Sequence, residues 1–234
     1  WHPANAPHIF GTRGAAGTRD AIHIISPDAT AAHLRRASAI VRAVAARAGL
    51  ILFVGTRPGH ARIVVDAARR AGACHLFTRW IAGSLTNAQR ILGRCARHVV
   101  DGRDRRVWGF ADQLRTAPAL VPDLVVVLNP GENGTLLAEC AAAGVPTIGV
   151  VDTDVDPLRV TYVIPANDDS LRAVALIAGV LGRAGAEGRE ERMARARVGQ
   201  FGAPVAHGLV PPTPGQAERE RAEEELQRRE GEAE

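Results

Sequence analysis

The sequence contains no lysine, and all 29 of its basic residues are arginine. An Ala-rich chain that uses only arginine is most simply explained by a genome rich in G and C. Aromatic residues are scarce at 4%, so the core must be built from Val, Ile, Leu and Ala. No run of 18 uninterrupted apolar residues occurs, which argues against a transmembrane helix. Together these absences favour an aliphatic core in a protein that does not span a membrane.

Cysteine is also rare, with only Cys74, Cys95 and Cys140. No two of them lie at metal-ligand spacing, and three is an odd number for a disulfide framework. A reducing compartment is the simplest interpretation. The chain begins at Trp1 rather than Met, so it carries no information on a targeting peptide.

The charge is unevenly distributed along the 234 residues. The segment from Gly215 to Glu234 holds eight Glu and four Arg, a net charge of −4. Since the whole chain has a formal net charge of +4, the rest of the chain carries +8. A basic body suits a polyanionic partner such as RNA. This charge suggests a partner of that kind but does not assign one.

Apolar runs and helical periodicity alternate through the middle of the chain. A helix capped by Ser26, with Pro27 at its first position, precedes this alternation. Strands are predicted at 51–54, 75–78, 124–128, 147–151 and 160–164, and helices at 61–70, 85–100, 135–143 and 170–181. Strands that alternate with helices over short loops predict a flavodoxin-like, doubly wound five-stranded parallel sheet of the α/β class.

Three regions are expected from these patterns. Residues 1–25 form an N-terminal hairpin-like extension, residues 26–200 form the α/β domain, and residues 201–234 form a Pro/Gly linker and a charged tail. The tail contains Glu–Arg pairs at i,i+4 but has almost no apolar face. We therefore expect it to be a solvated helix or disordered.

The loop GTRPGH, from Gly55 to His60, has the outline of a phosphate-binding loop because it joins a strand to a helix. It lacks both the G-x-x-x-x-G-K-[ST] and the G-x-G-x-x-G patterns, and the chain has no Lys for a phosphate contact. We interpret it as a strand-to-helix connection and expect no nucleotide cofactor there. Arg57 is the residue in this loop that could contact a phosphate, which we expect to belong to RNA.

Three aspartates in GVVDTDVD raise the question of a metal site. A calcium loop starting at Asp152 would need Gly and Glu where Pro157 and Val163 stand. A haloacid-dehalogenase-type phosphatase would use Asp152 as nucleophile and Asp154 as the second magnesium ligand. The absence of Lys and the position on the fourth strand oppose that enzyme. The alternative is an Asp-rich loop that satisfies backbone donors.

Arginine-bearing loops are the remaining candidates, as contacts to an RNA backbone. Arg79 and Trp80 precede IAGSLTN, where Thr86 and Asn87 open a predicted helix. Ordinary solvated arginine explains this pattern equally well from the residues alone. The candidate rRNA-binding residues are His2, Arg13, Arg19, Arg57, Arg79, Trp80, Thr86, Asn87, Arg90 and Arg94.

Taken in order, the segments IFGTR, ILFVGTR, RWIAGSLTN, PDLVVVLNP, GVVDTDVDP and VIPANDDS resemble the small-ribosomal-subunit protein two family over roughly residues 1–182. The resemblance implies a flavodoxin-like structural component that contacts small-subunit rRNA and neighbouring ribosomal proteins. It implies no enzyme activity, cofactor, metal, small-molecule substrate or membrane. Arg13, Arg79–Trp80 and Thr86–Asn87 stand at positions that match the motifs of the family.

One departure from bacterial members bears on the compartment. Those members carry a long helical hairpin between the LTN helix and the PDLVVV strand, whereas the interval Gly93–Val121 is short here and contains Gly, Pro and Trp. The reduction resembles mitochondrial members, so we expect a ribosome-associated protein of the mitochondrial matrix. The alternatives are a chloroplast or bacterial version, the phosphatase built on Asp152 and Asp154, and a nucleotide-binding module.

Overall fold

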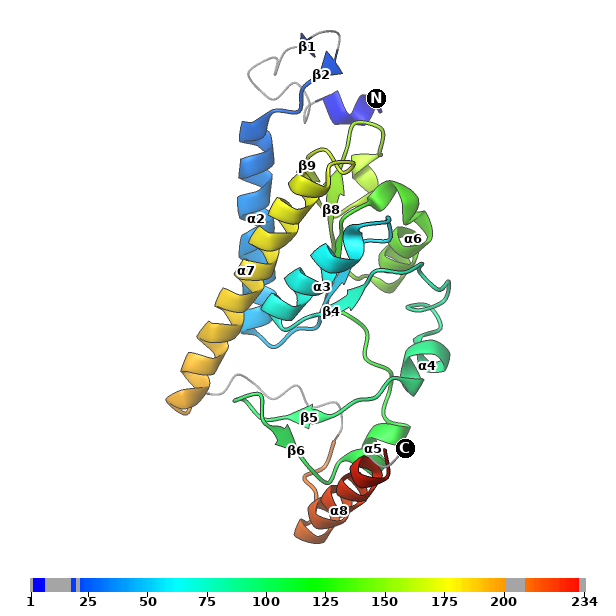
Figure 1. Ribbon diagram of the computed structural model, residues 1–234, viewed down its shortest axis with the longest axis vertical. Coiled ribbons are helices and arrows are strands. Elements are labelled where there is room, and N and C mark those ends of the chain that lie inside the picture. The colour runs from blue at the N-terminus through cyan, green and yellow to red at the C-terminus, as the bar shows by residue number, and fades with distance from the viewer. Residues whose placement is uncertain (1, 7–17, 20–21, 201–208, 232–234) are drawn as a thin grey trace. The chain divides into compact units, whose positions relative to one another are not determined.

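The computed structural model describes residues 2–6, 18–19, 22–200 and 209–231. Their contacts divide the chain into two compact units. The first unit consists of residues 1–86 and 121–192, and the second of residues 87–120 and 193–234. The parallel sheet and its covering helices belong to the first unit, and the C-terminal helix belongs to the second (Figure 1). In the described part of the chain, no helix is both long and apolar enough to span a bilayer.

A five-stranded parallel sheet forms the centre of the first unit. Its strand order is β4-β3-β7-β8-β9, which in chain order is the 2-1-3-4-5 arrangement of flavodoxin-like folds. The predicted fold class is therefore confirmed. The strands are β3 (Ile51–Val54), β4 (Cys74–Leu76), β7 (Leu124–Val127), β8 (Thr147–Val151) and β9 (Tyr162–Pro165).

Helices cover both faces of this sheet because alternate strand residues point to opposite sides. Phe53 and Val126 pack in one core cluster with buried residues of α2, α3 and α7, whereas Val54 and Val127 pack in another with α6. Figure 1 shows α2 and α7 lying across the same side of the sheet. The helices are α2 (Pro27–Ala46), α3 (His60–Ala71), α6 (Gly134–Ala143) and α7 (Leu171–Arg197).

The helix ends follow from local sequence. The Ser26 hydroxyl accepts a hydrogen bond from the Ala29 amide at 3.4 Å, and Pro27 occupies the first position of α2, as predicted. Gly72 and Gly144 end α3 and α6 with left-handed φ values of 66° and 69°. Each of these signals was visible in the sequence, and each falls within a residue or two of the expected boundary.

Helix α7 continues past the predicted 170–181 into the Arg/Glu-rich stretch from residue 187, where the sequence left a continuation of the helix open. Glycines stand where the helix crosses α3 and α2. A methyl group on Gly182 would lie 2.8 Å from the carbonyl oxygen of Ala67, and one on Gly185 would lie 2.5 Å from Ala71 Cβ. A methyl group on Gly188 would overlap the Arg42 carbonyl oxygen. These contacts show close backbone packing, which a search for apolar periodicity does not detect.

The N-terminal segment is joined to the first unit by polar contacts. The side-chain nitrogen of Asn5, Nδ2, donates to the backbone carbonyl oxygens of Asp152 and Thr153 at 3.1 Å and of Val155 at 2.6 Å. The short 3₁₀ helix η1 (Pro3–Asn5) precedes two antiparallel strands, β1 (Thr18–Arg19) and β2 (Ile22–His23). The 3₁₀ turns η3 (Pro130–Glu132) and η4 (Pro157–Arg159) also belong to this unit.

Of the helix predicted over 85–100, only the single turn at 88–91 is α-helical, and the rest of the prediction is wrong. After α4 (Ala88–Ile91) and the 3₁₀ helix η2 (Leu92–Arg94), the chain turns into the antiparallel pair β5 (Val99–Val100) and β6 (Arg106–Val107), followed by α5 (Ala111–Thr116). The Arg97 guanidinium donates to the carbonyl oxygens of Leu114 at 2.5 Å and Pro118 at 2.7 Å. These bonds hold the segment after η2 against the end of α5 and favour a turn over a continuous helix.

Helix α8 (Pro214–Gly231) is ordered through charge rather than through an apolar face. Glu220 accepts hydrogen bonds from the backbone amides of Gly109 and Ala111, and Arg106 forms an ion pair with Glu224 at 2.6 Å. The Arg106 guanidinium also stacks 4.0 Å above the centroid of the Trp108 ring. Residues 214–231 are therefore helical, and the carboxylates of Glu220 and Glu224 neutralise the charge of Arg106 in β6.

Candidate functional site

The crevice between the carboxyl ends of β3 and β7 is where flavodoxin-like folds bind ligands, because the strand order reverses there. In this chain polar side chains bridge the two strand ends. The Thr56 amide donates to Asn129 Oδ1 at 3.1 Å, and Asn129 Nδ2 donates to Thr56 Oγ1 at 2.9 Å and to Glu132 at 2.8 Å. Asn133 Nδ2 donates to Thr56 Oγ1 at 3.0 Å. These groups bond to one another across the crevice.

Arg57 extends this network toward the start of α7. Its guanidinium donates to Glu132, to Asp168 Oδ1 at 3.0 Å and to Asp169 Oδ1 at 2.8 Å. The hydrogen bond to Glu132 and the nearby carboxylates raise the pKa of Arg57 above its ordinary range, although burial opposes this. Arg57, the residue of the GTRPGH loop that was predicted to contact a phosphate, thus binds the carboxylates of Glu132, Asp168 and Asp169. Its contact with RNA stays a prediction.

Three carboxylates, those of Asp152, Asp168 and Asp169, have oxygens within 4.8 Å of one another and could hold a metal. Arg57 contacts two of them and supplies the positive charge that such a cluster requires. Burial raises the pKa of Asp168 to about 6, against the opposing effect of Arg57. Asp154, which the phosphatase interpretation pairs with Asp152, is exposed and is not in this group of the described residues.

The glycines of the loop serve packing. A methyl group on Gly55 would lie 2.7 Å from Val64 Cγ2 and 3.1 Å from His60 Nδ1, and Gly59 has φ +88°. His60 is 1% exposed, and burial lowers its pKa with a further contribution from the Arg57 charge. The interpretation of this loop as a tight strand-to-helix connection is confirmed.

A buried carboxylate organises the loop that carries Arg79 and Trp80. Glu139 of α6 accepts hydrogen bonds from Trp80 Nε1 at 3.0 Å and from the amides of Gly83 at 2.7 Å and Leu85 at 3.0 Å. Burial alone would raise the pKa of Glu139, but these hydrogen bonds together lower it. The sequence analysis assigned Glu139 no role. The available signal was a single acid within an otherwise apolar helix.

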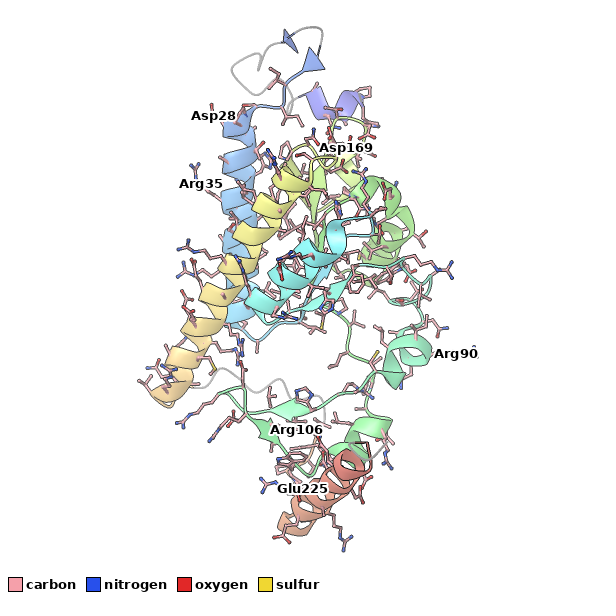
Figure 2. The ribbon with its side chains drawn as sticks, in the orientation of Figure 1. Asp28, Arg35, Arg90, Arg106, Asp169 and Glu225 are labelled. Atoms are coloured by element: carbon pink, nitrogen blue, oxygen red, sulfur yellow. The ribbon has the colours of Figure 1, made fainter. Side chains whose placement is uncertain are left out.

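The structure places the predicted RNA-contacting residues in different settings. Arg79 and Thr86 are exposed in the first unit, and Asn87 and Arg90 are exposed in the second. Figure 2 shows Arg90 on α4. Among the described residues, neither Arg79 nor Arg90 makes an ion pair. Trp80 is half-buried against the α6 core cluster, so its indole anchors the loop.

The remaining members of that set lie in the N-terminal segment and in η2. His2 Nδ1 accepts the Ala4 amide at 3.3 Å, and the His2 amide donates to the Thr153 carbonyl at 2.6 Å. Arg19 lies in β1 and Arg94 in η2. Arg13 lies outside the described residues. For every residue in the set, contact with rRNA stays a prediction.

These features define a flavodoxin-like α/β protein in which side chains bridge the ends of β3 and β7 and whose loops expose arginine. Comparison with known proteins then identifies the particular family. The family model described as "Ribosomal protein S2" matches residues 1–188. The chain belongs to the ribosomal protein S2 family, as the sequence motifs predicted.

Individual relatives agree with this assignment. The chain is 57% identical over 199 residues to small ribosomal subunit protein uS2m of Neurospora crassa, a match covering 85% of this chain and 45% of that protein. It is 48% identical over 184 residues to uS2m of Schizosaccharomyces pombe, covering 78% and 66% respectively. A bacterial uS2 from Methylobacterium is 34% identical over 207 residues, covering 80% and 58%.

The chain thus spans about half the length of the Neurospora relative and about two thirds of the fission yeast relative. The homologues are proteins of the small ribosomal subunit, and they include mitochondrial members at higher identity than the bacterial ones. No enzymatic family is indicated by these matches. The phosphatase interpretation of Asp152 and Asp154 therefore gains no support from them.

Proposed function

We propose that this chain is a structural constituent of the mitochondrial small ribosomal subunit, where it binds small-subunit rRNA and neighbouring ribosomal proteins in support of mitochondrial translation. The observation that carries the proposal is the 57% identity to a mitochondrial-type uS2m protein, against 34% for a bacterial uS2. The same difference favours the mitochondrial over the bacterial version of the protein. The matrix is the compartment in which such a ribosome works.

The physical role that fits this proposal is that of a scaffold. The sheet and its helices hold Arg79 next to a loop fixed by Glu139, so an exposed guanidinium is carried on a rigid support. Arginine binds phosphate oxygens through planar, multidentate contacts that position a protein without reading base sequence. The polar network around Thr56 and Asn129 is satisfied internally, which suits a protein that binds through its surface.

Fractionation of mitochondria tests the proposal. The full chain carrying an epitope tag is expressed in its source organism, and purified mitochondria are lysed and separated on sucrose gradients. We expect the chain to co-sediment with small-subunit rRNA and to shift with it when low magnesium dissociates ribosomes. Recovery only in free, soluble fractions would overturn the proposal. Recovery with ribosomes of a chloroplast would replace it with the organellar alternative.

A further inference from the structure

Two helices of the first unit leave a trough between their outer sides. Small and aliphatic side chains line it together with polar and charged ones, and its volume is about 410 Å³. The lining positions recur every three or four residues along each helix, so one stripe of α2 faces one stripe of α7. The lining residues are Ala31, Leu34, Arg35, Ser38, Ala39 and Arg42 of α2, with Val180, Ala184 and Glu187 of α7.

The walls of this α2–α7 trough remain exposed. Val180 is 39% exposed, and Leu176, one turn earlier on α7, is 64% exposed. The hydroxyl oxygen of Ser38, another lining residue, is buried and has no hydrogen-bond partner among the described residues.

Charge at the rim indicates the sign of an occupant. Arg42 bonds to Glu191, and Glu187 bonds to Arg183 at 3.2 Å, so these charges are compensated. Arg35 is exposed and makes no ion pair within the described part of the chain, and Figure 2 shows it projecting from α2. The uncompensated charge beside the trough is therefore positive.

From this combination we propose that the α2–α7 trough docks an amphipathic helix of a neighbouring small-subunit protein, with an acidic side chain of that helix opposite Arg35. The proposal rests on the proposed ribosomal function and names a contact within it. Leu34 and Val180 suit the apolar face of a helix, and the small side chains of Ala31, Ala39 and Ala184 allow its backbone to approach closely. An RNA strand fits less well, since the trough offers no aromatic side chain for base stacking.

Composition of assembled subunits provides one test. Val180→Asp places a carboxylate in the trough at an exposed helix position, and Leu158→Asp makes the same change at a residue that is 84% exposed outside it. Small subunits are purified through the tagged full chain and quantified by mass spectrometry. We expect Val180→Asp subunits to keep the chain and its rRNA but to lose one neighbouring protein about tenfold. Leu158→Asp subunits should keep that protein.

Photo-crosslinking identifies the occupant without perturbing the fold. A benzophenone amino acid replaces Ala39, which is exposed and lines the trough, and intact subunits are irradiated. We expect a crosslink to an acidic amphipathic helix of the protein that Val180→Asp displaces. Arg35→Glu should weaken that crosslink, and reversing the facing acidic residue to Arg should restore it.

A crosslink to rRNA, to a second copy of this chain, or to nothing would overturn the docking proposal while leaving the ribosomal function intact. The docking proposal would also be overturned if subunits carrying Val180→Asp contained the same proteins as wild-type subunits. Absence of the wild-type chain from small subunits would instead overturn the proposed function. The two failures are therefore distinguishable in one preparation.

Discussion

The indole nitrogen of Trp80 donates a hydrogen bond to Glu139 at 3.0 Å, which ties the loop after β4 to helix α6. The same carboxylate accepts hydrogen bonds from the amides of Gly83 and Leu85, so one buried side chain fixes the path of the six residues from Trp80 to Leu85. Arg79 immediately precedes this anchored stretch. The position of an exposed cation is thus set by a carboxylate on a different helix.

Glu139→Ala should lower the free energy of unfolding by about 2–4 kcal/mol, because several buried donors lose a charged acceptor. Since the folded pKa of Glu139 lies below its unfolded value, its contribution is present above about pH 4.5 and is lost as pH falls through the folded pKa. Denaturant unfolding of the full chain, followed by tryptophan fluorescence at several pH values, measures both effects. Glu190→Gln, at an exposed position of α7, is the matched control. If Glu139→Ala were as stable as the wild type, Glu139 would not be the residue that holds this loop in place.

Asp168 should contribute a pH dependence of the opposite sign. Its folded pKa of about 6 lies above the unfolded value of 3.8, so the folded chain holds a proton between these pH values that the unfolded chain releases. Wild-type stability relative to Asp168→Asn should therefore fall as pH rises from 4 to 6.5, by roughly 3 kcal/mol at most. Other groups titrate in both proteins and cancel in the difference. Asp169→Asn keeps Asp168 and removes only one of the smaller contributions to its pKa, so it should retain most of the wild-type slope. A pH-independent difference for Asp168→Asn would contradict the assignment.

Gly188→Ala should destabilise the packing of α7 on α2 by about 1–3 kcal/mol, because the new methyl group meets the backbone carbonyl of Arg42. Gly179→Ala is the matched control on the same helix. Nothing lies within 4 Å of its added methyl group, so it should stabilise the chain by about 0.5–1 kcal/mol. Chemical denaturation of both variants checks the sign. If both variants changed the free energy of unfolding in the same direction, helix propensity, rather than the contact with the Arg42 carbonyl oxygen, would decide the result.

Glu220→Gln should loosen helix α8 within the second unit. The carboxylate of Glu220 accepts the amides of Gly109 and Ala111 and lies near Arg106, and the amide replacement loses the charge. Hydrogen exchange over residues 214–225 should accelerate by roughly tenfold, as expected for the loss of a charge-assisted bond. Mass spectrometry of the full chain measures this. Glu223→Gln, at an exposed position of α8, should leave the exchange unchanged. Equal rates in both variants would mean that charge does not hold α8.

Changing Arg79 and Arg90 to Glu should weaken incorporation into small subunits several-fold while leaving the isolated fold intact. Both side chains are exposed, and each reversal replaces an attraction to phosphate with a repulsion. Gradient sedimentation of tagged chains reports incorporation, and thermal unfolding reports the fold. Arg36→Glu combined with Arg172→Glu, at exposed positions of α2 and α7, changes the total charge by the same amount and is the control. Normal incorporation of the double variant would remove these residues from the RNA-contacting set.

The sequence predicted the sheet well because β7 and β8 are buried on both faces and read as continuous apolar runs. It failed where a contact between distant residues decides the local structure. Trp80 and Glu139 are 59 residues apart, and Arg57 and Asp168 are 111 apart, so no pattern in a short window links them. Arg97 likewise redirects a segment whose own periodicity predicts a helix. The region boundaries at 25 and 200 and the RNA-contacting residues stay predictions.

The side-chain network between the ends of β3 and β7 also bears on what stabilises the fold. A fold that holds a diffusible ligand at this position gains stability in proportion to the logarithm of the ligand concentration. Here Thr56, Asn129, Asn133 and Arg57 occupy the same position through groups that belong to the chain. Their hydrogen bonds stabilise the fold without a bound ligand, so this part of the folding free energy comes from groups of the chain itself.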